Sequence, residues 1–461
     1  MYQVDFDHPS HVYFIGIGGI SMSGLAEILL SEGFTVSGSD WNHSPLTRLL
    51  ESQGARINYG NPQKAENITD DIDLVVYTAA VHTDNPEYAE AVRRQLPCLS
   101  RAQLLGQMMK NYRTPIAISG THGKTTTTSM IAEILLAAKT DPTISVGGIL
   151  QSIHGNIRVG GSELFVTEAC EYTNSFLSFF PRIGIILNIE EDHMDFFKDL
   201  DDIRSSFRRF AALLPQDGLL ILNGTIPDPE YLMEGLSCRT ITFGMTPSCD
   251  YFASDISYDE MACASFTLHT PTGLSLPIHL GVPGEHNIQN ALAALALSEE
   301  LRLDLSFAAN ALHSFQGTDR RFEYKGEWKG ATIIDDYAHH PTEITATLKA
   351  AANYPHKRLW CIFQPHTYTR TKAFLKDFAK ALSLADYVIL TDIYAARETD
   401  TLGISSAHLL REVTALGTQC WHFSSFEEIE NFVQKKCLPG DLLITMGAGD
   451  VVNIGEFLLG Q

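Results

Sequence analysis

With 461 residues and 44% hydrophobic side chains, the chain is long enough for about two to four domains. Its 55 acidic side chains outnumber 33 basic ones, and the net charge of −22 argues against nucleic acid or an anionic membrane as the main partner. Without a recognisable signal peptide, an apolar run near the ~20 residues of a membrane span, or a C-x-x-C pair, we expect a cytoplasmic protein with no membrane insertion and no zinc site.

The first segment opens as an apolar strand that enters a glycine turn, over residues 12–18. A helical pattern follows, and a second strand covers residues 34–40 and ends in an acid. This βαβ order with Gly16-x-Gly18 is typical of a dinucleotide-binding turn, although Ser21 stands where the third glycine is expected. A nicotinamide cofactor is one interpretation, but no second glycine-rich cofactor feature accompanies the turn. Residues 73–78 form another buried strand.

The most informative stretch is residues 118–126, Ile-Ser-Gly-Thr-His-Gly-Lys-Thr-Thr, between an apolar strand and a helical pattern. Such a turn points several backbone N–H groups at one spot, where the helix dipole favours an anion. Lys124 adds a mobile positive charge, and Thr125 supplies the hydroxyl that usually completes a Mg²⁺ shell in such loops. Ile118 stands where the common nucleotide-binding pattern has its first glycine, so a chance glycine turn is the alternative. We expect the loop to bind a nucleoside triphosphate.

Two strands of the second segment, residues 164–168 and 183–188, end in polar residues, where open α/β sheets place their ligands. If both strands flank the phosphate loop, Glu168 and His193 would hold Mg²⁺ beside the phosphates. A carboxylate is a natural ligand for this ion and an imidazole is less usual, so a purely local hydrogen-bonding role for His193 is the alternative. Residues 245–282 lack helical periodicity and predict antiparallel strands beside that sheet.

A third segment starts near Gly317 and alternates helices with strands at residues 332–337, 359–364, 387–394 and 441–446. Its Arg320-Arg321 pair is either a device that stabilises phosphoryl-transfer charge held by another domain or a solvated surface pair. Residues 335–341, Asp-Asp-Tyr-Ala-His-His-Pro, close a strand and lead into a helix. After the next strand, His366 and Arg370 offer a site for an anion, with helix capping as the alternative for His366.

These patterns predict an α/β protein of three domains: an N-terminal Rossmann-like domain, a central P-loop-type ATPase domain and a C-terminal Rossmann-like domain. We place them at residues 1–110, 111–316 and 317–461. Three consecutive α/β units suggest that a substrate is assembled between domains rather than inside one.

The motifs resemble those of the Mur ligase family, the ATP-dependent ligases that build the peptide stem of peptidoglycan. The matches run in order through residues 16–24, 120–126, 168–171, 188–193, 284–290, 320–321, 335–343 and 363–370. The opening glycine turn, the Asp-Asp-Tyr-Ala-His-His-Pro-Thr-Glu stretch and the Gln-Pro-His…Tyr-Thr-Arg stretch are most similar to the branch that adds L-alanine to UDP-N-acetylmuramate and to its murein-recycling relative.

The resemblance implies a role for each domain. The first would bind the uridine diphosphate part of UDP-N-acetylmuramate, with the candidate residues Gly16, Gly18, Gly19, Asp40 and Thr78. The second would bind ATP on the phosphate loop, with the candidates Gly120, Thr121, His122, Gly123, Lys124, Thr125 and Thr126. Mg²⁺ would be held by Thr125, Glu168 and His193, the adenine would lie near His286, Asn287 and Asn290, and the ribose near Asp335.

The third domain would close over the site and bring Arg320 or Arg321 to ATP. The lactyl carboxylate or the incoming L-alanine would face His340, His366 and Arg370. The resemblance implies catalysis by Lys124, His193, Arg320 and His340 through an acyl phosphate. We expect a monomer or a weak homodimer.

The chain departs from many members of the family at three positions, where they have a glycine, an acid and an arginine and this chain has Ser21, Cys170 and Thr367. Thr367 leaves Arg370 as the nearby arginine for a carboxylate. Three other interpretations stay open: a recycling ligase that adds a preformed peptide to the same sugar, a nicotinamide oxidoreductase, and an ATP-gated binding protein.

Overall fold

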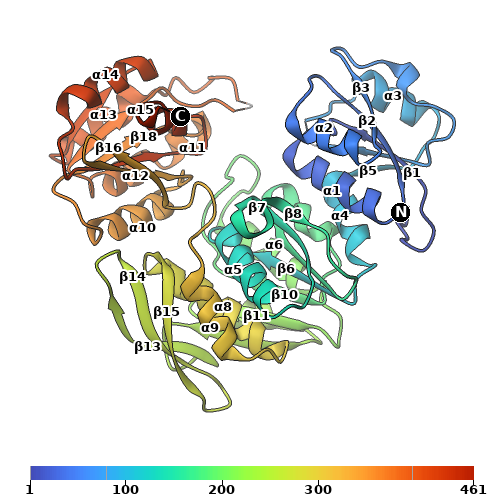
Figure 1. Cartoon of the computed structure of the whole chain (residues 1–461), viewed down its shortest axis with the longest axis horizontal. Helices are drawn as coiled ribbons and strands as arrows, with labels where there is room; N and C mark the ends of the chain where they lie inside the picture. The colour runs from blue at the N-terminus through green and yellow to red at the C-terminus, as the bar shows by residue number, and fades with distance from the viewer. Residues whose placement is uncertain (1, 79, 397, 461) are drawn as a thin grey trace.

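The computed structural model describes residues 2–78, 80–396 and 398–460, which form three α/β units in chain order (Figure 1). In Figure 1 the N-terminal unit lies above and to the right of the central unit, and the C-terminal unit lies above and to its left. Each unit is built on its own sheet. The predicted three-domain α/β fold is therefore confirmed.

The N-terminal unit is a parallel five-stranded sheet in the order β3-β2-β1-β4-β5. Its strands are β1 (His11–Ile15), β2 (Thr35–Asp40), β3 (Arg56–Tyr59), β4 (Leu74–Tyr77) and β5 (Cys98–Ser100). Its helices are α1 (Ile20–Ser31), α2 (Pro45–Ser52), η1 (Ala65–Asn67), α3 (Pro86–Arg93) and α4 (Arg101–Met109). In β1, Val12 and Phe14 pack into one core while Tyr13 and Ile15 pack into another, because successive side chains point to opposite faces of a sheet.

The central unit is a ten-stranded sheet in the order β15-β14-β13-β12-β11-β10-β6-β9-β7-β8. Its first strands are β6 (Thr114–Ser119), β7 (Thr143–Leu150), β8 (Gly155–Arg158), β9 (Leu164–Ala169), β10 (Ile183–Ile186), β11 (Leu219–Asn223) and β12 (Arg239–Gly244). Its helices are α5 (Lys124–Ala137), η2 (Gln151–Ile153), η3 (Tyr172–Ser178), α6 (Leu200–Ala211), α7 (Glu230–Met233), α8 (His286–Glu300) and α9 (Leu305–Ser314). The strands β9 and β10 flank β6 in parallel, so the carboxyl ends of all three meet at the phosphate loop.

The predicted antiparallel strands extend this sheet at one edge. They are β13 (Tyr251–Tyr258), β14 (Cys263–His269) and β15 (Ser275–Pro283). The β13–β14 and β14–β15 pairs are antiparallel, which confirms the prediction for residues 245–282. Alternating burial along β14 indicates that one of its faces packs on the core.

The C-terminal unit is a six-stranded sheet in the order β16-β17-β21-β18-β19-β20, parallel except for the edge strand β16. Its strands are β16 (Glu323–Trp328), β17 (Ala331–Asp336), β18 (Leu359–Phe363), β19 (Tyr387–Leu390), β20 (Gln419–His422) and β21 (Leu442–Met446). Its helices are α10 (Pro341–Ala352), α11 (Tyr368–Ala373), α12 (Leu375–Leu382), α13 (Ser406–Ala415), α14 (Phe426–Lys436) and α15 (Val452–Leu459). Among these strands, β16 and β20 were not predicted.

Close backbone contact joins the N-terminal unit to the central one. A Cβ on Gly106 of α4 would lie 1.9 Å from the Ser178 carbonyl oxygen, so no larger residue fits where α4 meets η3. On the other side, Thr318 Oγ1 donates to Ser129 Oγ at 2.9 Å and ties the chain entering the C-terminal unit to α5. None of the helices in the described residues combines the length and the apolar character needed to cross a bilayer.

Candidate active site

The phosphate loop is the turn from β6, which ends at Ser119, to α5, which begins at Lys124. Gly120 and Gly123 have φ values of 148° and 83°, a region that side chains rarely adopt. A Cβ on Gly123 would also lie 2.6 Å from Asn290 Oδ1. The turn therefore requires glycine, and the first N–H groups of α5 have no intrahelical acceptor, an arrangement suited to an anion.

Lys124 folds back over this loop. Its Nζ donates to the carbonyls of Gly120 and Thr121 at 2.5 and 3.0 Å and to Glu171 Oε2 at 2.9 Å. Burial acts to lower the pKa of Lys124, but the Glu171 carboxylate and further neighbours such as Glu168 together raise the pKa above its ordinary value. Because the Glu171 side chain is only 3% exposed, the two charges depend on each other.

The three predicted Mg²⁺ ligands fall into two neighbouring groups. Thr125 Oγ1 donates to Glu168 Oε2 at 3.2 Å. The His193 ring stacks on Tyr172, and its Nε2 lies 3.8 Å from Glu171 Oε1. That Glu171 oxygen is buried and has no hydrogen-bond partner within the described part of the chain. A buried carboxylate oxygen without a hydrogen-bond partner and a hydroxyl–carboxylate pair are oxygen donors that fit Mg²⁺, which prefers oxygen ligands.

His122 links the phosphate loop to the C-terminal unit. Its N–H donates to Asn188 Oδ1 at 2.8 Å, and its carbonyl accepts from Asn188 Nδ2 at 3.0 Å. Its ring nitrogens lie 3.1 Å from Glu343 Oε1 and 3.6 Å from Glu190 Oε2. Burial acts to lower the pKa of His122, but the two carboxylates outweigh it and raise the pKa to about 9. His122 is therefore a positive charge shared between two units.

His340 completes a cluster in which donor atoms of His122, Glu190 and His340 lie within 4.8 Å of one another, a spacing that could hold a metal ion. Its Nε2 donates to the Glu191 carbonyl at 3.0 Å, and its Nδ1 accepts from the Thr342 N–H at 3.3 Å as the cap of α10. Both ring nitrogens are thus engaged, and His122 carries a proton. The cluster is therefore better explained by ion pairing and capping than by a metal.

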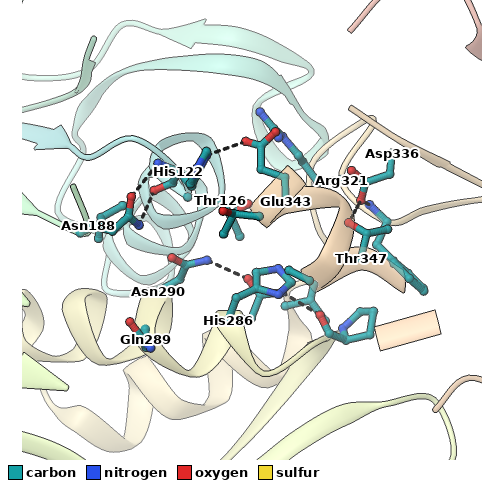
Figure 2. Close-up of a pocket in the computed structure, with 18 of the residues that line it drawn as sticks. His122, Thr126, Asn188, His286, Gln289, Asn290, Arg321, Asp336, Glu343 and Thr347 are labelled. Carbon is teal, nitrogen blue, oxygen red and sulfur yellow. Dashed lines mark hydrogen bonds and ion pairs between the residues drawn. The ribbon is translucent and has the colours of Figure 1, made fainter. Parts of the chain in front are cut away.

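A pocket of about 260 Å³, here called pocket A, lies between α5, α8 and α10 (Figure 2). Six predicted nucleotide-binding residues line it: His122, Gly123, Thr126, His286, Asn287 and Asn290. Asn290 Nδ2 donates to Asn287 Oδ1 at 2.9 Å, and burial lowers the pKa of His286 to about 4, so this imidazole is neutral. Figure 2 shows α8 on one side of the pocket and Arg321 and Asp336 on the other.

Arg320 and Asp335 do not line pocket A, which differs from the predicted arrangement. Arg320 Nε donates to the buried Asp335 at 2.9 Å, and its other nitrogens donate to two carbonyls of the turn between β21 and α15. The neighbours Arg321 and Asp336 line the pocket instead. Successive strand residues point to opposite faces, so the Asp-Asp motif does not reveal which aspartate faces a ligand. Burial raises the pKa of Asp336 to about 6, opposed by Arg321.

A second pocket of about 650 Å³, pocket B, lies where residues 192–195 of the central unit meet residues 366–374 of the C-terminal unit. It brings the predicted residues His193, His366 and Arg370 together, whereas His340 is not among its lining residues. Burial lowers the pKa of His366 to about 4, and its Nδ1 lies 3.2 Å from an Arg370 nitrogen. A neutral imidazole can accept that hydrogen bond.

The N-terminal glycine turn is closed by Asp40, another of the predicted substrate-binding residues. Gly18 N–H donates to Asp40 Oδ2 at 2.8 Å, and a Cβ on Gly18 would lie 2.8 Å from the same oxygen. Gly19 caps α1, and Thr78 lies 4.0 Å from where a Gly16 Cβ would be. These five predicted residues therefore surround one turn at the carboxyl ends of β1, β2 and β4.

Several polar residues that build the site were not singled out from the sequence: Glu171, Asn188, Glu190, Asp192, Asp336 and Glu343. All of them lie inside the motif stretches used for the family resemblance, so their position in a motif was the available signal. Their partners lie far along the chain, as with His122 and Glu343, 221 residues apart, and no local pattern encodes such a pairing.

Comparison with known proteins gives matches along the whole chain. The family descriptions "Mur ligase family, catalytic domain", "Mur ligase middle domain" and "Mur ligase, glutamate ligase domain" match residues 11–113, 118–298 and 320–449. A UDP-N-acetylmuramate–L-alanine ligase from Agathobacter rectalis is 60% identical over 459 residues, with 100% of both chains covered.

Two solved structures are also similar to this chain over nearly its whole length. The UDP-N-acetylmuramate–alanine ligase of Thermotoga maritima is 31% identical with a TM-score of 0.81, covering 98% of this chain and 99% of that chain. A murein peptide ligase from Psychrobacter arcticus is 27% identical with a TM-score of 0.71, covering 98% of both. With its three units matched in order and a relative of 60% identity over its whole length, the chain belongs to the Mur ligase family.

Proposed function

We propose that the chain is an ATP-dependent ligase that joins L-alanine to the lactyl carboxylate of UDP-N-acetylmuramate. A carboxylate oxygen attacks the γ-phosphorus of ATP and releases ADP, leaving an acyl phosphate. The amine of L-alanine then attacks the acyl carbon, phosphate leaves, and the nitrogen loses a proton. The names of the relatives at 60% and 31% identity support this reaction over the alternatives.

The observation that carries the proposal is the segment after β10, which serves both pockets. Asn188 clamps His122 of the phosphate loop with two hydrogen bonds. Four residues later, Asp192 holds Arg370 in pocket B, and His193 lines the same pocket. One short stretch of backbone therefore fixes the distance between an anion-binding loop and a second polar pocket, as a two-substrate transfer reaction requires.

In this proposal ATP binds with its base in pocket A and its phosphates on the glycine turn. Lys124 would exchange the carbonyls of Gly120 and Thr121 for phosphate oxygens, because its ammonium is a mobile point charge. We assign Thr125, Glu168 and His193 to Mg²⁺, supported by the Thr125–Glu168 contact and by the orphaned Glu171 oxygen near His193. When bound, Mg²⁺ withdraws charge from the phosphates.

We assign the arginine that faces the phosphates to Arg321 rather than Arg320, because Arg321 lines the same pocket as His122 and Gly123 of the phosphate loop. Arg320 is instead held by Asp335. Docking of the C-terminal unit through His122 and Glu343 would exclude water, which would otherwise hydrolyse the acyl phosphate.

We also propose domain boundaries at residues 1–110, 111–316 and 317–461. UDP would bind at the N-terminal glycine turn, and the protein would be a cytoplasmic monomer or weak homodimer.

The test is phosphate release from ATP and Mg²⁺ with UDP-N-acetylmuramate, with and without L-alanine. Release that requires both, with a product heavier by one alanyl residue, is the expected result. A recycling ligase, the activity named for two similar solved structures of 27% and 28% identity, would instead respond to a preformed tripeptide and not to free L-alanine. No release with any acceptor would overturn the proposal.

A further inference from the structure

Asp192 connects residues of two units in pocket B, and the sequence patterns gave it no role in binding or catalysis. We propose that Asp192 is a positioning residue for the amino-acid half of the reaction. It reaches from the central unit to orient Arg370 and, through Arg370, His366. The inference rests on the proposed function, because it concerns how the incoming amino acid is recognised.

One oxygen of Asp192 gathers three donors. Its Oδ1 accepts from Arg370 Nε at 3.1 Å, from Arg370 NH2 at 2.8 Å and from the backbone N–H of His193 at 2.7 Å. Arg370 NH1 in turn lies 3.1 Å from the His366 carbonyl and 3.2 Å from His366 Nδ1. Asp192 therefore fixes Arg370 from one unit while His366 fixes it from the other.

The pairing is almost fully removed from solvent. The Asp192 and Arg370 side chains are 7% and 10% exposed. The other acids lining pocket B have partners of their own: Asp195 accepts from the Tyr172 hydroxyl at 2.8 Å, and Glu398 accepts from the Thr369 N–H at 3.0 Å. A guanidinium buried this deeply needs a charge partner, and within the described lining of pocket B that partner is Asp192.

The geometry decides what Arg370 offers to a ligand. A guanidinium has five N–H groups, and four contacts run from Arg370 to Asp192 and His366. One N–H of a rigidly held, planar group is left for a carboxylate in pocket B. Since Asp192 belongs to the central unit, this donor is aligned only when the C-terminal unit is docked, so recognition of the amino acid is coupled to docking.

The test measures the steady-state constants of the full-length chain for all three substrates. We expect Asp192→Asn to raise the KM for L-alanine by about tenfold or more, with the KM values for ATP and UDP-N-acetylmuramate changed by less than about twofold. Asp192→Glu, which keeps the charge, should recover part of the loss. The control is Glu260→Gln, the same change in charge at an exposed side chain that lines neither pocket, which should leave all constants unaltered.

Thermal unfolding checks that each variant is folded. If Asp192→Asn does not fold, Arg370→Lys replaces it: this variant keeps the charge but cannot hold Asp192 and His366 together, so the same selective rise is expected. An unchanged or lowered KM for L-alanine, or a parallel rise for all three substrates, would overturn the inference. An inactive wild-type chain would overturn the proposed function instead.

Discussion

Replacement of Gly123 by alanine tests the phosphate loop most directly. Gly123 has φ +83°, and the new Cβ would lie 2.6 Å from Asn290 Oδ1, a distance that real Cβ atoms essentially never show. Gly273 has nearly the same φ, +81°, but nothing lies within 4 Å of its added Cβ. The pair of variants therefore separates backbone strain from contact with Asn290.

The magnitudes follow from the two environments. Alanine at a φ near +80° costs about 1 kcal/mol at either position. At Gly123 the methyl must also displace Asn290, whose Nδ2 is bonded to Asn287 Oδ1 at 2.9 Å. Such overpacking typically adds about 1–3 kcal/mol. We expect Gly123→Ala to lower the stability of the central unit by about 2–4 kcal/mol, against about 1 kcal/mol for Gly273→Ala.

The assay combines thermal unfolding with calorimetric titration of ATP. For a unit of this size, Tm should fall by about 4–16 °C in Gly123→Ala and by about 2–4 °C in the control. ATP affinity should fall by about tenfold or more in Gly123→Ala, because Asn290 lines pocket A, and stay unchanged in Gly273→Ala. Equal Tm shifts and equal ATP affinities in the two variants would refute the reasoning.

Three further predictions concern charges around the loop. Lys124→Met should abolish phosphate release and lower the free energy of unfolding by about 3–5 kcal/mol, because it leaves Glu171 buried and unpaired. The double variant that also carries Glu171→Gln should regain stability but not turnover. Retained activity in Lys124→Met would contradict the assignment. The raised pKa of His122, about 9 against an ordinary 6.5, contributes up to about 3 kcal/mol of stability that is complete below pH 6.5 and is lost as pH rises through about 9. The free energy of unfolding of the wild type and of His122→Asn, measured by denaturation between pH 6 and 10, tests this prediction. The same dependence of that free energy on pH in both proteins would contradict it. Glu168→Gln should raise the Mg²⁺ concentration needed for half-maximal phosphate release by about tenfold, with the KM for L-alanine unaltered; an unchanged Mg²⁺ requirement would exclude Glu168 as a ligand.

The family resemblance and the main elements could be predicted from the sequence because local patterns specify them. The glycine turn at residues 120–123 follows from backbone positions that only glycine adopts readily, and β13, β14 and β15 follow from the absence of a helical period. The strands that were not predicted are β3, β5, β7, β8, β11, β12, β16 and β20. For the edge strand β16 and the short β20, pairing with a neighbouring strand, rather than their own composition, makes them strands.

Tertiary structure decided which member of each neighbouring pair serves the site. Arg320 and Arg321 are equivalent in sequence, yet one binds Asp335 and the other lines pocket A. The Asp192–Arg370 pair joins residues 178 positions apart, across two units whose docking no local pattern encodes. Sequence determines periodicity, turn chemistry and the order of the motifs, because these depend on residues within a few positions of one another. The pairing of charged residues from different units depends on how the three sheets are oriented relative to one another, and only the assembled structure sets that orientation.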